Sequence, residues 1–142
     1  MKESLTKERY NILKEKASKL LSLSSNHNPF YLSKILGIEV KTEFLEENVP
    51  GFILDDVIYI SNKIDSYSKK IVCAHELGHY ILHDNVDSFK LFYAGKESII
   101  EFEANLFVKE IMPQVFARAK WNNFEYITDF NEYVESQIRF LE

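Results

Sequence analysis

The sequence has little cysteine and no long apolar run. Cys73 is the single cysteine among 142 residues, so an internal disulfide is excluded. The N-terminal stretch MKESLTKERYNILKEK carries charges where a secretory signal peptide needs an apolar segment. No uncharged apolar run approaches the ~20 residues that cross a bilayer. These features predict a cytosolic protein without a transmembrane segment.

Positive charge is also scarce. The chain has 17 Lys and Arg against 22 Asp and Glu, which gives a formal net charge of -5. The basic clusters at 14–19 and 69–70 are short, and the acidic balance would repel a phosphate backbone. Direct binding to nucleic acid is therefore disfavoured.

Repeats, low-complexity segments and linker-like stretches are absent, which predicts a single domain over residues 1–142. A domain of this size buries about 68% of the surface of its unfolded chain. Neither a disulfide nor a metal is then needed to hold the fold together. A metal in this protein would need a chemical explanation.

The first half of the sequence predicts two helices followed by short strands. Apolar residues at helical spacing indicate an amphipathic helix over 4–23, started near Ser4. Pro29 begins a short helix over 29–36 that Gly37 ends. Ile38, Val40 and Thr42 alternate with charged residues as in a half-buried strand, and a turn is expected at 50–51. The runs 52–54 and 57–61, joined by two aspartates, predict an antiparallel hairpin.

The second half of the sequence is predicted to be mostly helical. Ile71, Ala74 and Gly78 belong to a helical apolar pattern that predicts a largely buried helix over 68–83. A loop over 84–96 and a helix over 97–112, closed by Pro113, are expected next. The remaining residues predict a short helix after Pro113 and a longer one from position 128. The fold class is α+β, with a small, mostly antiparallel sheet packed against the helix over 68–83 and further helices.

The buried helix carries the motif H-E-x-x-H as His75-Glu76-Leu77-Gly78-His79. Positions four apart lie on one face of a helix, so His75 and His79 can both reach one metal ion. Glu76 then flanks that ion and is a candidate general acid and base. The pattern alone is suggestive, and its place inside a predicted helix strengthens it.

A catalytic zinc needs a third protein ligand and one open position for water. His83 continues the same helix and would lie ~12 Å along the axis from His75, which is a poor reach. A third histidine at position 85 would suit a longer motif, but Asn85 stands there. Glu101 and Glu103 cannot both face one ion. Glu101 is favoured because it shares a helix face with Ala104 and Asn105, and the amide of Asn105 can accept the second imidazole N–H of a ligand histidine.

Four segments of the sequence are HELGHYILH, EFEANLF with the run ending in Met112-Pro113, GFILDDVIYIS and NPFYLSKILGIEV. Together they resemble the ImmA/IrrE family of zinc metallopeptidases over roughly residues 28–115. The resemblance implies a zincin-like fold and a gluzincin-like zinc site formed by His75, His79 and Glu101. It also implies that Glu76 occupies the catalytic position. Val-Lys-Glu-Ile-Met-Pro stands where the family usually has small and apolar residues before Leu-Met-Pro, a departure that affects packing rather than ligands.

A site of this kind would hydrolyse a peptide bond in a protein substrate. The family resemblance further implies that small members from phages or mobile elements act as anti-repressors on a helix-turn-helix repressor. Because one amphipathic helix is too little for such a module, the repressor would be a separate protein. Tyr67, Tyr80 and Tyr93 are candidate donors to the oxyanion, and the hairpin over 52–61 could align an extended substrate as an added strand.

Several alternatives remain open at this stage. The protein could instead be a zinc-binding regulator that captures a transcription-factor or toxin-antitoxin partner without cleaving it. His83 is expected to be a helix C-terminal residue favoured by the helix dipole, and Cys73 a small core residue. Close packing or substrate access would explain Gly78 inside a helix.

Overall fold

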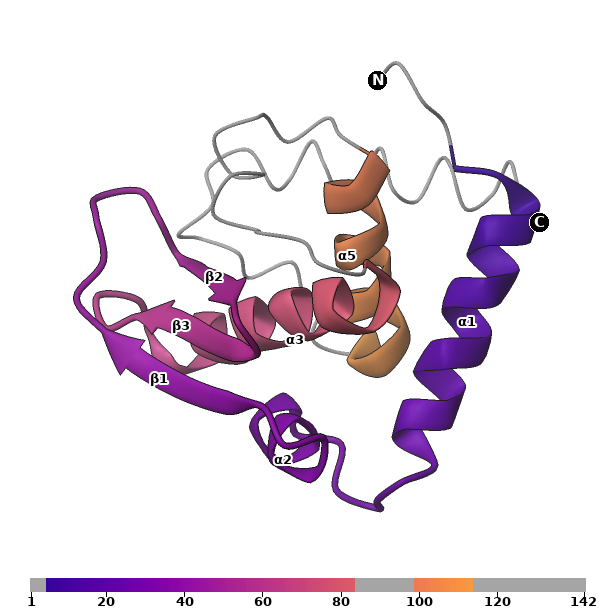
Figure 1. Cartoon of the computed structure of the whole chain (residues 1–142), viewed down its shortest axis with the longest axis horizontal. Helices are drawn as coiled ribbons and strands as arrows, with labels where there is room; N and C mark the ends of the chain where they lie inside the picture. The colour runs from indigo at the N-terminus through magenta and orange to yellow at the C-terminus, as the bar shows by residue number, and fades with distance from the viewer. Residues whose placement is uncertain (1–4, 84–98, 114–142) are drawn as a thin grey trace.

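The computed structural model describes residues 5–83 and 99–113 (Figure 1). The predicted loop over 84–96 and the predicted helices after Pro113 lie outside these residues. The described elements, in chain order, are α1 (Lys7–Leu21), α2 (Pro29–Ile35), β1 (Glu39–Glu43), β2 (Gly51–Leu54), β3 (Val57–Ser61), α3 (Ser66–Leu82) and α5 (Ile99–Ile111).

The two N-terminal helices form as their sequence predicts, apart from the start of α1. Thr6 caps α1 by accepting a hydrogen bond from the backbone N–H of Arg9 at 3.1 Å, so the helix begins at Lys7 rather than near Ser4. The expected apolar face of α1 is buried. Asn28 caps α2 in the same way, and Gly37 ends it with a φ of 78°, a backbone conformation that favours glycine.

The sheet has the order β1-β3-β2. β2 and β3 form the predicted antiparallel hairpin, and Asp55 and Asp56 both have positive φ, as a two-residue turn of this kind requires. β1 pairs with β3 in parallel, with Glu39 opposite Val57. The α+β class is thus confirmed, but the sheet is mixed rather than mostly antiparallel.

The connection between β1 and β2 explains this difference. The backbone N–H of Val49 bonds the carbonyl of Glu46, so the chain turns over 46–49 and Gly51 already belongs to β2 instead of the predicted turn. β2 therefore runs opposite to β1. β3 then returns between them, antiparallel to β2 and parallel to β1. Thr42 is exposed, and only Val40 of the β1 side chains is partly buried.

Helix α3 is the central element, as predicted. Its N-cap Asp65 accepts a hydrogen bond from the backbone N–H of Ser68 at 2.7 Å, and the helix starts two residues earlier than expected. Figure 1 shows α3 crossing the middle of the molecule, with the sheet on one side and α1 and α5 on the other. α3 contacts β2, β3, α1, α2 and α5. Among the described residues, no helix is long and apolar enough to cross a membrane.

Gly78 lies where α3 meets α5. A Cβ at this position would be 3.0 Å from the Cβ of Phe107, which is fully buried. Close packing of the two helices therefore accounts for Gly78 inside α3. Cys73 is fully buried as expected, with its Sγ 3.6 Å from the hydroxyl of Ser33, and burial raises the pKa of its thiol to about 12.

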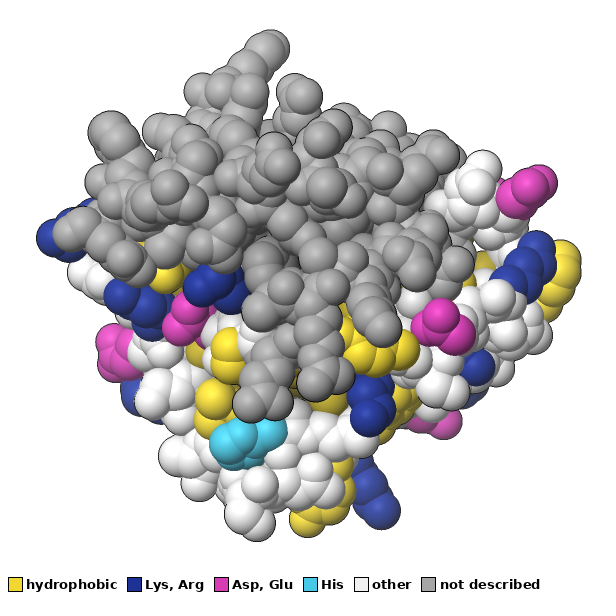
Figure 2. Space-filling model, turned by 180° about the vertical axis from the view of Figure 1, so that it is seen from behind, with side chains coloured by type: hydrophobic (Ala, Val, Ile, Leu, Met, Phe, Trp, Pro, Cys, Tyr) yellow, Lys and Arg dark blue, Asp and Glu magenta, His cyan; other side chains and the backbone are white. Residues whose placement is uncertain are grey.

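Charged side chains of both signs lie on the described surface. Figure 2 shows Lys and Arg interspersed with Asp and Glu on the described part of the face seen from behind, rather than gathered into one basic field. This distribution agrees with the acidic net charge of the sequence.

Gly51 provides a test of the packing between the hairpin and α3. A Cβ there would lie 2.5 Å from Cγ1 of Val72 and 2.6 Å from the backbone oxygen of Tyr59. We expect Gly51→Ala to lower the free energy of unfolding by about 1–3 kcal/mol because the extra methyl overpacks this contact. Chemical denaturation would measure the loss. Lys41→Ala on the exposed side of β1 is the control, and equal stability of the two variants would contradict this packing.

Candidate metal centre

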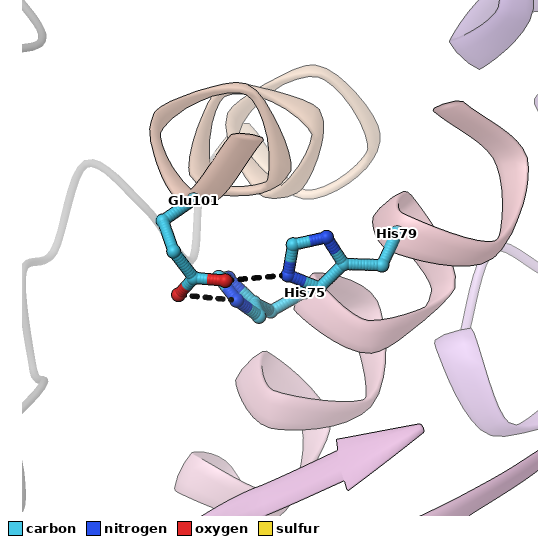
Figure 3. A group of neighbouring side chains, drawn as sticks. All are labelled: His75, His79 and Glu101. Carbon is cyan, nitrogen blue, oxygen red and sulfur yellow. Dashed lines mark hydrogen bonds and ion pairs between the residues drawn. The ribbon is translucent and has the colours of Figure 1, made fainter. Parts of the chain in front are cut away.

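Three side chains from α3 and α5 converge on one point (Figure 3). His75 and His79 lie one helical turn apart on the side of α3 that faces α5, and Glu101 extends toward them from the first described turn of α5. Nε2 of His79 is 2.6 Å from Oε1 of Glu101, and Nε2 of His75 is 3.3 Å from Oε2. Candidate ligand atoms from the three residues lie within 4.8 Å of one another. This is the group that the sequence predicted, and its atoms could hold a metal ion.

The amide of Asn105 positions the ring of His75. Its Oδ1 lies 3.1 Å from Nδ1 of His75, and its Nδ2 donates to the backbone oxygen of Glu101 at 3.1 Å. Since the second bond fixes which end of the amide faces His75, Nδ1 of His75 is the hydrogen-bond donor. The lone pair of a neutral His75 is then on Nε2, which faces Glu101. The contact predicted for Asn105 is present.

His79 is supported on its other nitrogen by His83. The two Nδ1 atoms are 3.0 Å apart, and Nε2 of His83 is 2.9 Å from Oε1 of Glu103. His83 is the C-cap of α3, at the helix C-terminus as expected, and it also makes these two side-chain contacts. α3 ends at Leu82, and His83 has an extended backbone that returns its ring toward His79. His83 does not belong to the converging group, as expected from its distance along the helix.

The sequence analysis did not identify Arg9. Its Nε and Nη2 donate to the two carboxylate oxygens of Glu103 at 2.5 and 2.6 Å. The two residues are 94 positions apart, and no local pattern relates a helix near the N-terminus to one near position 100. Glu103, considered as an alternative metal ligand, instead binds Arg9 and His83.

Electrostatics hold the group together when no metal is bound. Burial disfavours the charged form of His75, but the carboxylate of Glu101 outweighs this cost and raises the pKa of His75 to about 9. Burial likewise opposes ionisation of Glu101, yet its pairing with His75 and His79 lowers the pKa of Glu101 well below its usual range. Burial lowers the pKa of His83 despite its bond to Glu103. For Glu103, the hydrogen bonds from His83 and Arg9 outweigh burial and lower the pKa of the carboxyl group.

Glu76 has a buried oxygen without a partner. The residue is 4% exposed, and its Oε1 makes no hydrogen bond. A buried carboxylate oxygen left in this way is costly, so it calls for an explanation by function. Glu76 directly follows His75 in the sequence, and its free oxygen could accept a proton there. The two imidazoles and one carboxylate of the converging group are a ligand set that zinc sites use.

Other predicted features lie near the site or outside it. Tyr93 is outside the described residues, Tyr67 packs against the core, and Tyr80 is exposed. A cavity of about 1050 Å³ lies between α1, the β2–β3 turn and the end of α3, where His79 and His83 line it. His75, Glu76 and Glu101 are not among the residues that line this cavity.

Comparison with known proteins places the chain in a family. A family model described as the IrrE N-terminal-like domain, a peptidase family, matches residues 34–139. This chain belongs to that family. It is also similar to the uncharacterized immunity region protein 2 of Bacillus phage phi105, with 27% identity over 129 residues that cover 84% of this chain and 80% of that protein. No solved structure matches the chain. The match confirms the predicted relationship to the ImmA/IrrE family.

Metal binding at this group should depend on pH. In the metal-free protein, His75 holds a proton below a pH of about 9, and a metal requires its neutral form. We expect the apparent zinc affinity to fall by about tenfold for each unit that the pH is lowered from 9 to 7, because each ion displaces one proton. Competition with a chromophoric chelator would measure it, with circular dichroism confirming that the fold is intact. An affinity that is constant between pH 7 and 9 would contradict this prediction.

Proposed function

We propose that this protein is a zinc-dependent endopeptidase in which His75, His79 and Glu101 hold the metal and Glu76 is the catalytic acid and base. The observation that carries the proposal is the convergence of three ligand atoms next to a carboxylate whose buried oxygen has no partner. The peptidase family to which the chain belongs supports the same reaction class.

The residues divide the chemistry between them. A zinc ion held by His75, His79 and Glu101 would supply Lewis-acid chemistry, which polarises a scissile carbonyl and lowers the pKa of water from 15.7 to about 7. The free oxygen of Glu76 accepts the proton of the attacking water as the new C–O bond forms. Glu76 then donates this proton to the amine that leaves when the C–N bond breaks. Asn105 and His83 hold the two imidazoles in the orientation that directs Nε2 toward the metal.

The substrate that we propose is a separate helix-turn-helix repressor of a phage or mobile element, which makes the protein an anti-repressor protease. Support comes from the phage relative, whose name places that protein in an immunity region. The acidic net charge also favours a protein over DNA as the direct partner. Among the described strands, β2 is at one edge of the sheet and packs against α3, so it could pair with an extended segment of the substrate.

Replacing Glu76 separates cleavage from binding. Glu76→Gln keeps the size of the side chain but removes the proton acceptor, so we expect zinc binding and repressor binding to persist. Cleavage should fall by about 10²–10⁴-fold. The measurement is the rate at which zinc-loaded protein cleaves a helix-turn-helix repressor that it binds, followed by gel electrophoresis and mass spectrometry.

Glu15→Gln, on the exposed face of α1, is the matched control and should cleave at the rate of the unmodified protein. If Glu76→Gln cleaves as fast as this control, the assignment of Glu76 is wrong. If the unmodified, zinc-loaded protein binds the repressor but leaves it intact, the protein is a regulator that captures its partner without hydrolysis.

A further inference from the structure

A continuous series of hydrogen bonds joins the N-terminal helix to one candidate metal ligand. Arg9 of α1 binds both carboxylate oxygens of Glu103, Glu103 binds Nε2 of His83, and Nδ1 of His83 contacts Nδ1 of His79. His79, His83 and Glu103 are buried, whereas the side chain of Arg9 is 51% exposed. The series therefore runs from the surface of the protein to the edge of the metal centre.

The chemistry of each atom gives this series one direction. Glu103 is a carboxylate bound by Arg9, so it accepts and Nε2 of His83 must donate. A neutral His83 then has its lone pair on Nδ1, and Nδ1 of His79 must be the donor in the contact between the two rings. In the metal-free protein, Nε2 of His79 lies 2.6 Å from Oε1 of Glu101 and donates to this carboxylate. Because Nδ1 keeps its hydrogen, release of the Nε2 hydrogen leaves a lone pair on Nε2 for a metal ion. The tautomer of His83 thus keeps the hydrogen of His79 on Nδ1, and this leaves Nε2 of His79 as the atom that can bind a metal.

Arg9 is the outermost residue of this series. Its two hydrogen bonds fix both oxygens of Glu103, and one of these oxygens also accepts from His83. α1 precedes residues 34–139, which the family model matches, so this support comes from outside the matched region. The described residues thus assign a role at the site to a helix that contributes no candidate ligand.

We propose that Arg9 is a positioning residue for the metal centre, which acts through Glu103 and His83 to hold His79 in the orientation and tautomer that bind zinc. The packing of α1 against α5 consequently sets the affinity of the site for its metal. This inference rests on the proposed zinc site.

The first test is the zinc affinity of Arg9 variants. Arg9→Met keeps much of the apolar stem but removes both donors, and we expect the affinity to fall by about tenfold, the lower end of the range for residues that support metal ligands. Arg9→Lys retains one charged donor and should recover part of the loss. Lys7→Met removes a charge from the exposed first turn of the same helix, and it should leave the affinity unchanged.

Two further measurements distinguish positioning from a general effect on folding. Glu103→Gln should weaken zinc binding, and adding Arg9→Met to it should cause no additional loss, because both changes interrupt one series. In nitrogen-detected NMR spectra of the zinc-loaded full chain, His83 should carry its hydrogen on Nε2 and none on Nδ1. Circular dichroism shows whether each variant is folded.

The outcomes separate this inference from the proposed function. Failure of the unmodified protein to bind zinc overturns both. Three results overturn the role of Arg9 alone when the unmodified protein binds zinc normally. They are an unchanged zinc affinity in Arg9→Met, additive losses of affinity in the double variant, and a hydrogen on Nδ1 of His83. If Arg9→Met does not fold, Arg9→Lys and Glu103→Gln give the same comparison.

Discussion

The close packing of α5 on α3 is the constraint on which the site depends. Gly78 allows it, because any larger residue would place a Cβ against the Cβ of Phe107. At this separation, Glu101 reaches two imidazoles on the neighbouring helix, and Asn105, one turn further along, reaches the outer nitrogen of His75. The glycine inside the H-E-x-x-H motif is therefore explained by the close packing of the two helices.

Much of the described fold could be predicted because its signals are local. Helical spacing of apolar residues, capping residues such as Asn28, and the two aspartates of the hairpin each act within a few positions of the chain. The same holds for His75 and His79, whose separation of four places them on one face of a helix. Glu101 could be predicted from the sequence because it shares a helix face with Ala104 and Asn105.

The features that sequence reasoning missed depend on tertiary contacts. The parallel pairing of β1 with β3 results from the turn over 46–49, and the strand pattern itself does not determine it. His83 was assigned from its position at a helix end, whereas its extended backbone and the nearby carboxylate of Glu103 give it a structural role. Arg9 lacks any local signal, since its partner is on another helix. The buried side-chain oxygen of Glu76, which has no hydrogen-bond partner, could be recognised only from atomic positions.

The distance along the chain between Arg9 and Glu103 has a consequence for synthesis. Closing a loop of this length costs conformational entropy, so such contacts form late, after the local helices. A ribosome completes α1 and α3 well before the codons for α5 are read. Throughout that interval the nascent chain lacks both Glu101 and Glu103, the partner of Arg9. The converging group of His75, His79 and Glu101 can therefore assemble only after translation has passed α5.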